Sequence, residues 1–248
     1  MKPSVYSIEL TNKCNFDCGY CKRYFSDRKE GFMTMKTFKN SMKWLDNTLF
    51  LELHMNGESL LHPKFDEMVR MVREKVPFLG IATNGSLVDE HEETMMLFDE
   101  ITVSLHQVKK LRIDCLKKFK GLIRFQILGE QIFPLFLEKW EDKSNVKLDS
   151  LPFIDYKEKK KNKQICIDSL VNVAIQWDGD VVPCCKCNTK NEVLANVNID
   201  DVMELDGRYK VFDECKYCQF PNTYLFHMEL LKEIVLYAEN TYVASRKI

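Results

Sequence analysis

The sequence predicts an α/β fold in which a parallel sheet forms a partial (β/α)6 TIM-like barrel, followed by a small cysteine-rich extension. Short apolar segments alternate with helix-like segments, as they do in parallel βαβ units. About six such units fit before the lysine-rich run at 157–163, which is too few for an eight-unit barrel. The 248 residues suffice for one sizeable domain with an appendage. We therefore divide the chain into a barrel, residues 1–155, and an extension, residues 156–248.

The barrel segment contains six predicted strands, with helix-like segments at 36–45 and 64–75 among them. The second of these helices carries apolar residues at helical spacing. Polar residues follow several of the strands, and ligands bind at the carboxyl ends of the strands in barrels and open α/β sheets. The predicted strands are 5–9, 51–55, 79–83, 101–104, 122–128 and 146–153.

The pattern changes in the extension. Two apolar runs, 174–177 and 181–183, flank Asp178-Gly179-Asp180, and an Asp-Gly pair between apolar runs is a strong hairpin signal. Residues 223–240 predict a C-terminal helix, because apolar side chains recur on one face.

Composition excludes several function classes. The net charge of −1 gives no electrostatic argument for a nucleic-acid or membrane partner, and the basic run at 157–163 is expected to be a solvated connector. The first ten residues lack the apolar core of a signal peptide, and no run approaches the roughly 18 apolar residues of a membrane span. We therefore expect a cytoplasmic protein, whose thiols stay reduced and, where clustered, bind metal.

Three cysteines, Cys14, Cys18 and Cys21, lie directly after the first predicted strand. A structural zinc site has four ligands, and disulfides need pairs. Three thiolates can instead hold a [4Fe–4S] cluster and leave one iron open for another ligand. A zinc site completed by a distant residue is the alternative.

The stretch CNFDCGYC resembles the CxxxCxΦC signature of the radical S-adenosylmethionine (SAM) superfamily, with Tyr20 as the aromatic residue. This resemblance implies that SAM chelates the open iron through its amino and carboxylate groups. It also implies that an electron from the cluster cleaves SAM to a 5′-deoxyadenosyl radical, which abstracts a hydrogen atom from the substrate.

A second stretch, NGESLLHP at 56–63, resembles the GGEP motif of that superfamily. Gly57 and Glu58 match the motif, whereas Asn56 and Ser59 replace a glycine and a proline. The resemblance implies that Glu58 accepts a hydrogen bond from the ammonium of SAM. Gly and Asn alone often only make turns, but their order behind the cysteines is specific. The further SAM contacts that the resemblance implies are Thr83, Asn84, Ser104, Gln126 and Gly129.

The second cysteine cluster resembles the twitch and SPASM extensions of radical SAM enzymes. Because no cysteine follows Cys218, the shorter twitch form with one auxiliary [4Fe–4S] cluster is the better match. Cys185 and Cys187 are surplus to a four-ligand set, and a zinc knuckle is the alternative. Cys115 stands alone and is expected to be a small buried residue. The ligands that the resemblance implies are Cys166, Cys184, Cys215 and Cys218.

The layout of motifs resembles the 2-deoxy-scyllo-inosamine dehydrogenases. This resemblance implies oxidation of an alcohol to a ketone on a small polyol or aminosugar, with the auxiliary cluster as electron acceptor. It also implies a flavodoxin- or ferredoxin-type reductant. The alternatives are a radical SAM enzyme that modifies a peptide or protein, such as a peptide maturase or sulfatase maturase, and a non-catalytic zinc protein.

A catalytic base has to reach the mouth of the barrel, so polar residues at strand ends are the candidates. His106, two residues after Ser104, is the first of these, and Asp149 and Asp155 follow. His54 and His62 flank the Glu58 stretch and are expected to pack or form hydrogen bonds.

Overall fold

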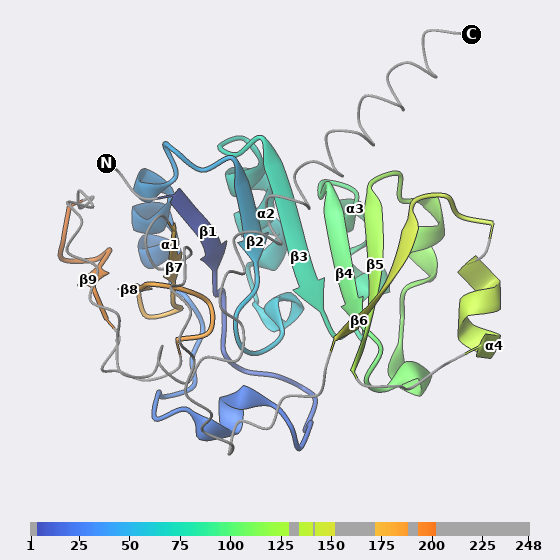
Figure 1. The fold of residues 1–248 in the computed structure, drawn as a ribbon. Helices are drawn as coiled ribbons and strands as arrows, with labels where there is room; N and C mark the ends of the chain where they lie inside the picture. The colour runs from blue at the N-terminus through green and yellow to red at the C-terminus, as the bar shows by residue number, and fades with distance from the viewer. Residues whose placement is uncertain (1–3, 129–133, 141, 152–171, 188–192, 202–248) are drawn as a thin grey trace, which may run out of the picture.

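The computed structural model describes residues 4–128, 134–140, 142–151, 172–187 and 193–201. In these residues, nine strands form one sheet in the order β6-β5-β4-β3-β2-β1-β7-β8-β9 (Figure 1). The strands are β1 Ser4–Ile8, β2 Phe50–Leu53, β3 Phe78–Thr83, β4 Glu100–Ser104, β5 Leu122–Leu128, β6 Val146–Leu151, β7 Asn172–Ile175, β8 Asp180–Val182 and β9 Ala195–Asn196.

Strands β1 to β6 are all parallel, and each pairs with the next one along the chain. This order confirms the prediction of a parallel α/β sheet and is consistent with a partial TIM-like barrel. All six predicted strands are present, and β5 has the predicted bounds.

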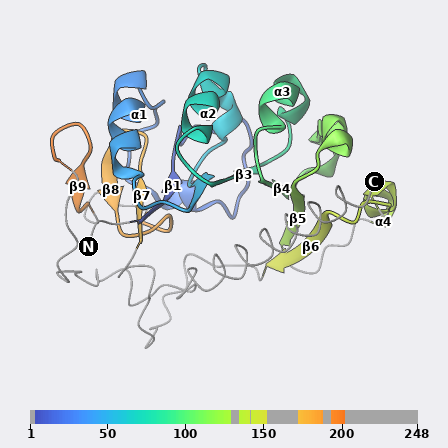
Figure 2. The same cartoon turned by 90° about the horizontal axis from the view of Figure 1, so that it is seen from above.

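The helices cover one face of this sheet (Figure 2). Helix α2 buries Phe65, Met68, Val69 and Val72, which lie on one stripe of the helix because they recur at spacings of three and four. The α-helices are α1 Met35–Ser41, α2 Phe65–Arg73, α3 Glu92–Met95 and α4 Pro134–Leu137. The 3-10 turns are η1 Lys22–Phe25, η2 Met42–Trp44, η3 Ser59–Leu61, η4 Val88–His91, η5 Val108–Lys110, η6 Asp114–Lys118 and η7 Glu138–Trp140.

The predicted helix at 36–45 is divided into α1 and η2. Thr34 starts it, and its hydroxyl accepts a hydrogen bond from Thr37 N at 3.1 Å. At the other end, the hydroxyl of Ser41 donates to Thr37 O at 2.9 Å. A serine that bonds back to the preceding turn competes with the helical ladder, which accounts for the change to 3-10 geometry after Ser41.

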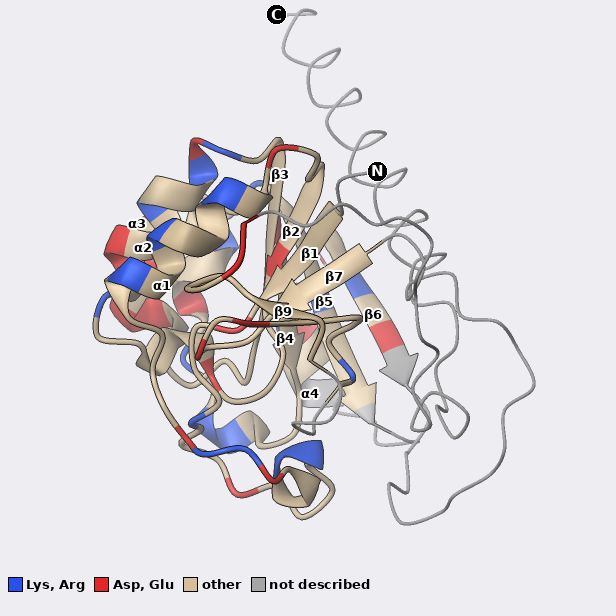
Figure 3. Cartoon of the chain, turned by 90° about the vertical axis from the view of Figure 1, so that its left-hand side faces the viewer, with Lys and Arg blue, Asp and Glu red and all other residues tan. Residues whose placement is uncertain are grey.

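The two faces of the sheet differ in polarity, because successive side chains of a strand point to opposite sides. On the side that the helices cover, apolar residues such as Leu51, Ile81 and Val103 belong to the main core. The alternate positions on the other side include Glu52 and Arg124. Among the helices that cover the sheet, α1 carries only basic charged residues, α3 carries only acidic ones, and α2 carries both (Figure 3).

The predicted hairpin after 172 is confirmed as the antiparallel pair β7 and β8, with Gly179 in the turn at φ +95°. Strand β7 also pairs in parallel with β1, so the sheet continues past the barrel strands. The predicted boundary at 155/156, the run at 157–163 and the helix at 223–240 lie outside the described residues. No helix in the described ranges has the length and apolar character to span a bilayer.

Candidate active site

The three motif cysteines lie in a loop directly after β1. Cys14, Cys18 and Cys21 are free, half-buried thiols, and Cys21 N donates to Cys18 O at 2.8 Å. In the described part of the chain, no three His, Cys, Asp or Glu side chains converge as ligands of one metal ion do. Each cysteine of a [4Fe–4S] cluster binds its own iron, whereas the ligands of a zinc ion share one metal. Burial raises the pKa of the Cys14 and Cys18 thiols, so cluster binding would have to release their protons.

The end of β3 and the segment after β2 lie beside this loop. Their residues Glu58, Thr83 and Asn84 form what we call the Glu58 wall. The Glu58 carboxylate is buried and accepts hydrogen bonds from Thr83 Oγ1 at 2.9 Å and from Asn84 N at 2.7 Å. Asn84 Nδ2 in turn lies 3.8 Å from Cys14 Sγ. Burial raises the pKa of Glu58, and the three hydrogen bonds that it accepts oppose this effect. The structure therefore brings three of the predicted SAM contacts together next to one motif cysteine.

Gly57 connects this wall to the cysteine loop. Its φ is +75°, which L side chains other than glycine rarely adopt. A Cβ atom at this position would lie 2.5 Å from Lys13 O and 2.7 Å from Thr11 O. Glu58 N also donates to Lys13 O at 2.8 Å, so the two backbones are in direct contact here.

We expect Gly57→Ala to destabilise the protein by about 1–3 kcal/mol, since a non-glycine residue would be strained at this φ, and to lower its iron content. Urea denaturation and iron analysis measure the two effects. Gly19→Ala is the matched control inside the cysteine motif, because a Cβ there has no atom within 4 Å. Equal stability of the two variants would contradict this account of Gly57.

The structure places His106 next to the aromatic residue of the cysteine motif. The rings of His106 and Tyr20 make an edge contact with centroids 5.1 Å apart. Burial lowers the pKa of His106, so the imidazole is neutral and able to accept a proton. Ser104 ends β4 and is the register partner of Gln126 on β5.

The remaining predicted site residues lie on β6 or in the loop after β8, or they fall outside the described residues. Asp149 on β6 accepts a hydrogen bond from Arg124 Nη1 at 3.0 Å, so its carboxylate is engaged in an ion pair. Cys184 lies in the loop after β8, next to Cys185. Five predicted residues lie outside the described ranges: Gly129, Asp155, Cys166, Cys215 and Cys218.

Sequence reasoning missed a set of charged residues on the polar face of the sheet. Arg124 is buried and also donates through Nε to Glu100 at 3.1 Å, which links strands β4, β5 and β6. Burial raises the pKa of Glu52 to about 7 and that of Glu100 to about 8. The signal was present in LELHM at 51–55, where charged and apolar residues alternate with the period of a strand.

The raised pKa of Glu52 predicts a pH dependence of stability. Its carboxyl is protonated up to about pH 7 in the folded state, against an ordinary value of 4.5. Between these two pH values the unfolded chain loses this proton first, so stability falls as the pH rises. We expect Glu52→Gln to flatten this part of the curve in urea titrations from pH 4.5 to 8. The exposed Glu74 serves as control, and an equal flattening in Glu74→Gln would contradict the assignment to Glu52.

The two cysteine regions are joined through Lys22, which follows the first motif. The Lys22 ammonium donates a hydrogen bond to Cys185 O, and Cys185 N donates to the hydroxyl of Tyr6 on β1. The loop after β8 therefore lies against β1 and the cysteine loop that follows it.

Two isolated residues have the structural roles expected of them. His62 accepts from Lys64 N through Nδ1 at 3.1 Å, and its Nε2 lies 2.8 Å from Met33 O, which assigns a neutral ring that donates from Nε2. Cys115 is buried, and Cys115 N donates to Asp89 Oδ1 at 2.9 Å. Neither residue belongs to the candidate site.

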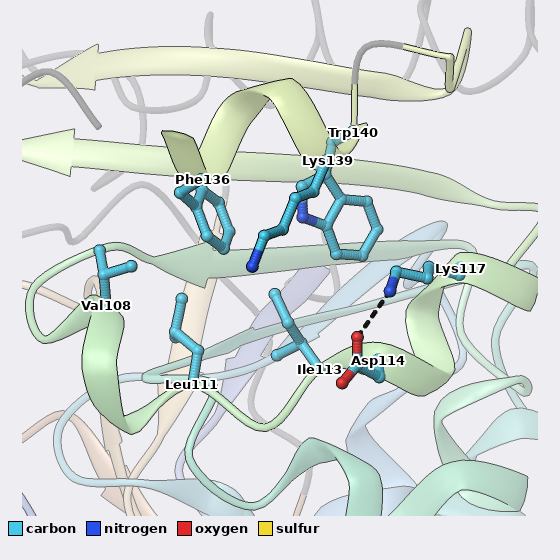
Figure 4. Close-up of a pocket in the computed structure, with 8 residues that line it drawn as sticks. All are labelled: Val108, Leu111, Ile113, Asp114, Lys117, Phe136, Lys139 and Trp140. Carbon is cyan, nitrogen blue, oxygen red and sulfur yellow. Dashed lines mark hydrogen bonds and ion pairs between the residues drawn. The ribbon is translucent and has the colours of Figure 1, made fainter. Parts of the chain in front are cut away.

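A cavity of about 300 Å³ lies between the loop after β4 and the α4–η7 segment. Figure 4 shows the Lys139 side chain reaching across it from the side of Phe136, and Asp114 paired with Lys117. Its lining is mostly apolar and includes none of the predicted site residues. The cavity is therefore separate from the site at the cysteine loop.

Three comparisons relate this arrangement to known proteins. Residues 8–124 match the family model of the radical SAM superfamily. Over 89 residues, the chain is 37% identical to the tungsten-containing aldehyde ferredoxin oxidoreductase cofactor-modifying protein of Pyrococcus furiosus. That match covers 34% of this chain and 24% of the relative, so the chain spans about a quarter of that protein's length.

Two solved structures share the fold. The crystal structure of BtrN in complex with AdoMet and 2-DOIA has a TM-score of 0.57 at 21% identity, with 80% of this chain and 79% of that chain covered. Streptococcus suis SuiB bound to precursor peptide SuiA has a TM-score of 0.61 at 14% identity, with 85% and 65% covered. Residues 8–124, which match the radical SAM superfamily model, contain both the cysteine loop and the Glu58 wall beside it.

Proposed function

We propose that this radical SAM enzyme oxidises an alcohol to a ketone on a small polyol or aminosugar. The observation that carries the proposal is the contact between the cysteine loop and the buried Glu58–Thr83–Asn84 network at the carboxyl ends of the strands. The polar sheet face supports a small hydroxylated substrate, because hydroxyl groups need placed hydrogen-bonding partners. BtrN, whose crystal structure holds AdoMet and 2-DOIA, shares this fold and supports the same class.

Each residue of the wall has a defined task in this proposal. When bound, the cluster and SAM supply a 5′-deoxyadenosyl radical that takes a hydrogen atom from the carbinol carbon. Glu58 has an acceptor position left on its carboxylate, since each oxygen carries two lone pairs, and it would hold the ammonium of SAM. Thr83 and Asn84 fix the orientation of that carboxylate through their hydrogen bonds.

The hydroxyl proton of the substrate needs a base, and His106 is the better of the two described candidates. Its imidazole is neutral because burial lowers its pKa, whereas Asp149 is engaged with Arg124. The remaining electron needs an acceptor. We propose an auxiliary iron–sulfur centre in the C-terminal cysteine region for it, and a flavodoxin- or ferredoxin-type reductant for the first cluster.

Modification of a peptide is the second candidate function. SuiB bound to its precursor peptide shares the fold over 85% of this chain. A peptide substrate would use the same cysteine loop and the same Glu58 wall, so the two functions differ only in what occupies the polar face of the sheet.

The test begins with anaerobic protein reconstituted with iron and sulfide, then treated with dithionite and SAM. We expect 5′-deoxyadenosine, and with a suitable cyclic polyol or aminocyclitol deuterated at the carbinol carbon, deuterium in that product and a ketone detectable by mass spectrometry. His106→Gln should keep substrate-free SAM cleavage but lose ketone formation.

Two outcomes separate the alternatives. Deuterium transfer only from peptides would favour the second function over the first. Bound zinc with no iron, or iron-loaded protein that forms no 5′-deoxyadenosine, would contradict the radical chemistry itself.

A further inference from the structure

The loop after β8 places the sulfurs of Cys184 and Cys187 side by side. Their Sγ atoms lie 3.9 Å apart, far beyond a disulfide bond of about 2.05 Å. The backbone makes a tight turn here, since Cys187 N donates to Cys184 O at 3.1 Å. Lys186 N also donates to Cys184 Sγ at 3.3 Å. The sequence-based ligand set includes Cys184 but gives Cys187 no role.

The separation of the two sulfurs indicates how many metal ions they share. Sulfurs placed tetrahedrally around one ion, at metal–sulfur distances of about 2.3 Å, stand about 3.8 Å from each other. Two cysteines of a [4Fe–4S] cluster bind different irons, which separates their sulfurs further. The 3.9 Å distance therefore fits a single shared ion and does not fit two corners of a cubane.

We propose that Cys184 and Cys187 chelate one tetrahedral metal ion, so that Cys187 is a ligand of the C-terminal centre. A Cys-x-x-Cys pair is the usual chelating unit for such ions. Thiolates select soft ions, zinc or the irons of a cluster, and a [2Fe–2S] centre also binds two cysteines at one iron. The inference rests on the proposed function only in locating a metal centre here, and it holds whichever substrate is oxidised.

Of the two residues between the ligands, Cys185 and Lys186, the cysteine is oriented differently. The Cys185 thiol faces the Tyr6 hydroxyl, and Cys185 packs in a small apolar cluster with Tyr6 and Met55. The Lys22 side chain donates to Cys185 O, which holds the main chain of this turn against the first cysteine loop.

The test compares Cys187→Ser with Cys184→Ser and with the matched control Cys185→Ser in the full-length protein. Iron, sulfide and zinc are counted per chain after anaerobic reconstitution. We expect Cys184→Ser and Cys187→Ser to lose the metal of the second site completely and Cys185→Ser to keep it. Substrate-free SAM cleavage reports on the first cluster and shows that each variant is folded.

A second measurement uses cobalt(II) in a variant whose first three cysteines are serine. We expect the thiolate-to-cobalt absorption of a tetrahedral site, present with Cys185→Ser and lost with Cys187→Ser. Full metal content in Cys187→Ser, or a Cys184–Cys187 disulfide in metal-free anaerobic protein, would overturn the proposal. Zinc at an intact site would uphold the chelate while removing the proposed electron acceptor, so the two failures are distinguishable.

Discussion

Cys14→Ser is expected to abolish the formation of 5′-deoxyadenosine from SAM. Cys14 Sγ lies against Asn84 of the Glu58 wall and accepts from Phe16 N at 3.4 Å, so this thiol adjoins the place assigned to SAM. A serine hydroxyl is a hard, weakly acidic group and does not replace a soft thiolate on iron. We expect loss of about four irons per chain, the content of one [4Fe–4S] cluster. Iron analysis and chromatography of the dithionite reaction measure both effects.

Cys115→Ser provides the control for this variant. Cys115 is buried away from the site and its sulfur lies 3.8 Å from Val88 O, an acceptor that a serine hydroxyl can also use. Its iron content and SAM cleavage should match those of the unchanged protein. If Cys14→Ser kept its iron and still cleaved SAM, the three-cysteine motif would not be the cluster site.

The parallel sheet could be predicted because each barrel strand is a short apolar run followed by a turn or helix signal. The stretch at 122–128, for example, has the bounds of β5. The parallel pairing of β7 with β1 could not be predicted in this way. It joins segments more than 160 residues apart in sequence, and local periodicity carries no information about which edge of a sheet a later strand joins.

The candidate site also has a part that the sequence could predict and a part that it could not. The cysteine motif and Gly57-Glu58 could be found because motif chemistry depends on residue type and spacing. The contact between Tyr20 and His106 depends on how the loops after β1 and β4 fold over the sheet. The buried ion pair between Arg28 and Glu9 was also not predicted, because a charged residue in a loop is usually solvated.

Arg28→Met is expected to destabilise the protein by about 3–5 kcal/mol, the usual cost of removing one partner of a buried ion pair. The Arg28 guanidinium contacts both oxygens of Glu9, at 2.5 Å and 3.2 Å, and the side chains are 2% and 0% exposed. Glu9 also accepts from Asn56 N at 3.2 Å and from Trp177 N at 3.3 Å. Without Arg28 this carboxylate would remain buried and lose the cation paired with it. Urea denaturation at pH 7 measures the loss.

The Arg28–Glu9 pair also holds the far end of the cysteine loop against the end of β1. Iron retention in Arg28→Met should therefore fall together with stability. Arg70→Met is the control, because Arg70 and Glu93 are exposed partners at 3.9 Å and such pairs contribute about 0–1 kcal/mol. The double variant Glu9→Gln/Arg28→Met removes the unpaired charge and should recover part of the stability. If it were no more stable than Arg28→Met, the loss would come from packing around the arginine stem and not from the buried carboxylate. Recovery of stability without recovery of iron would show that the guanidinium itself positions the loop.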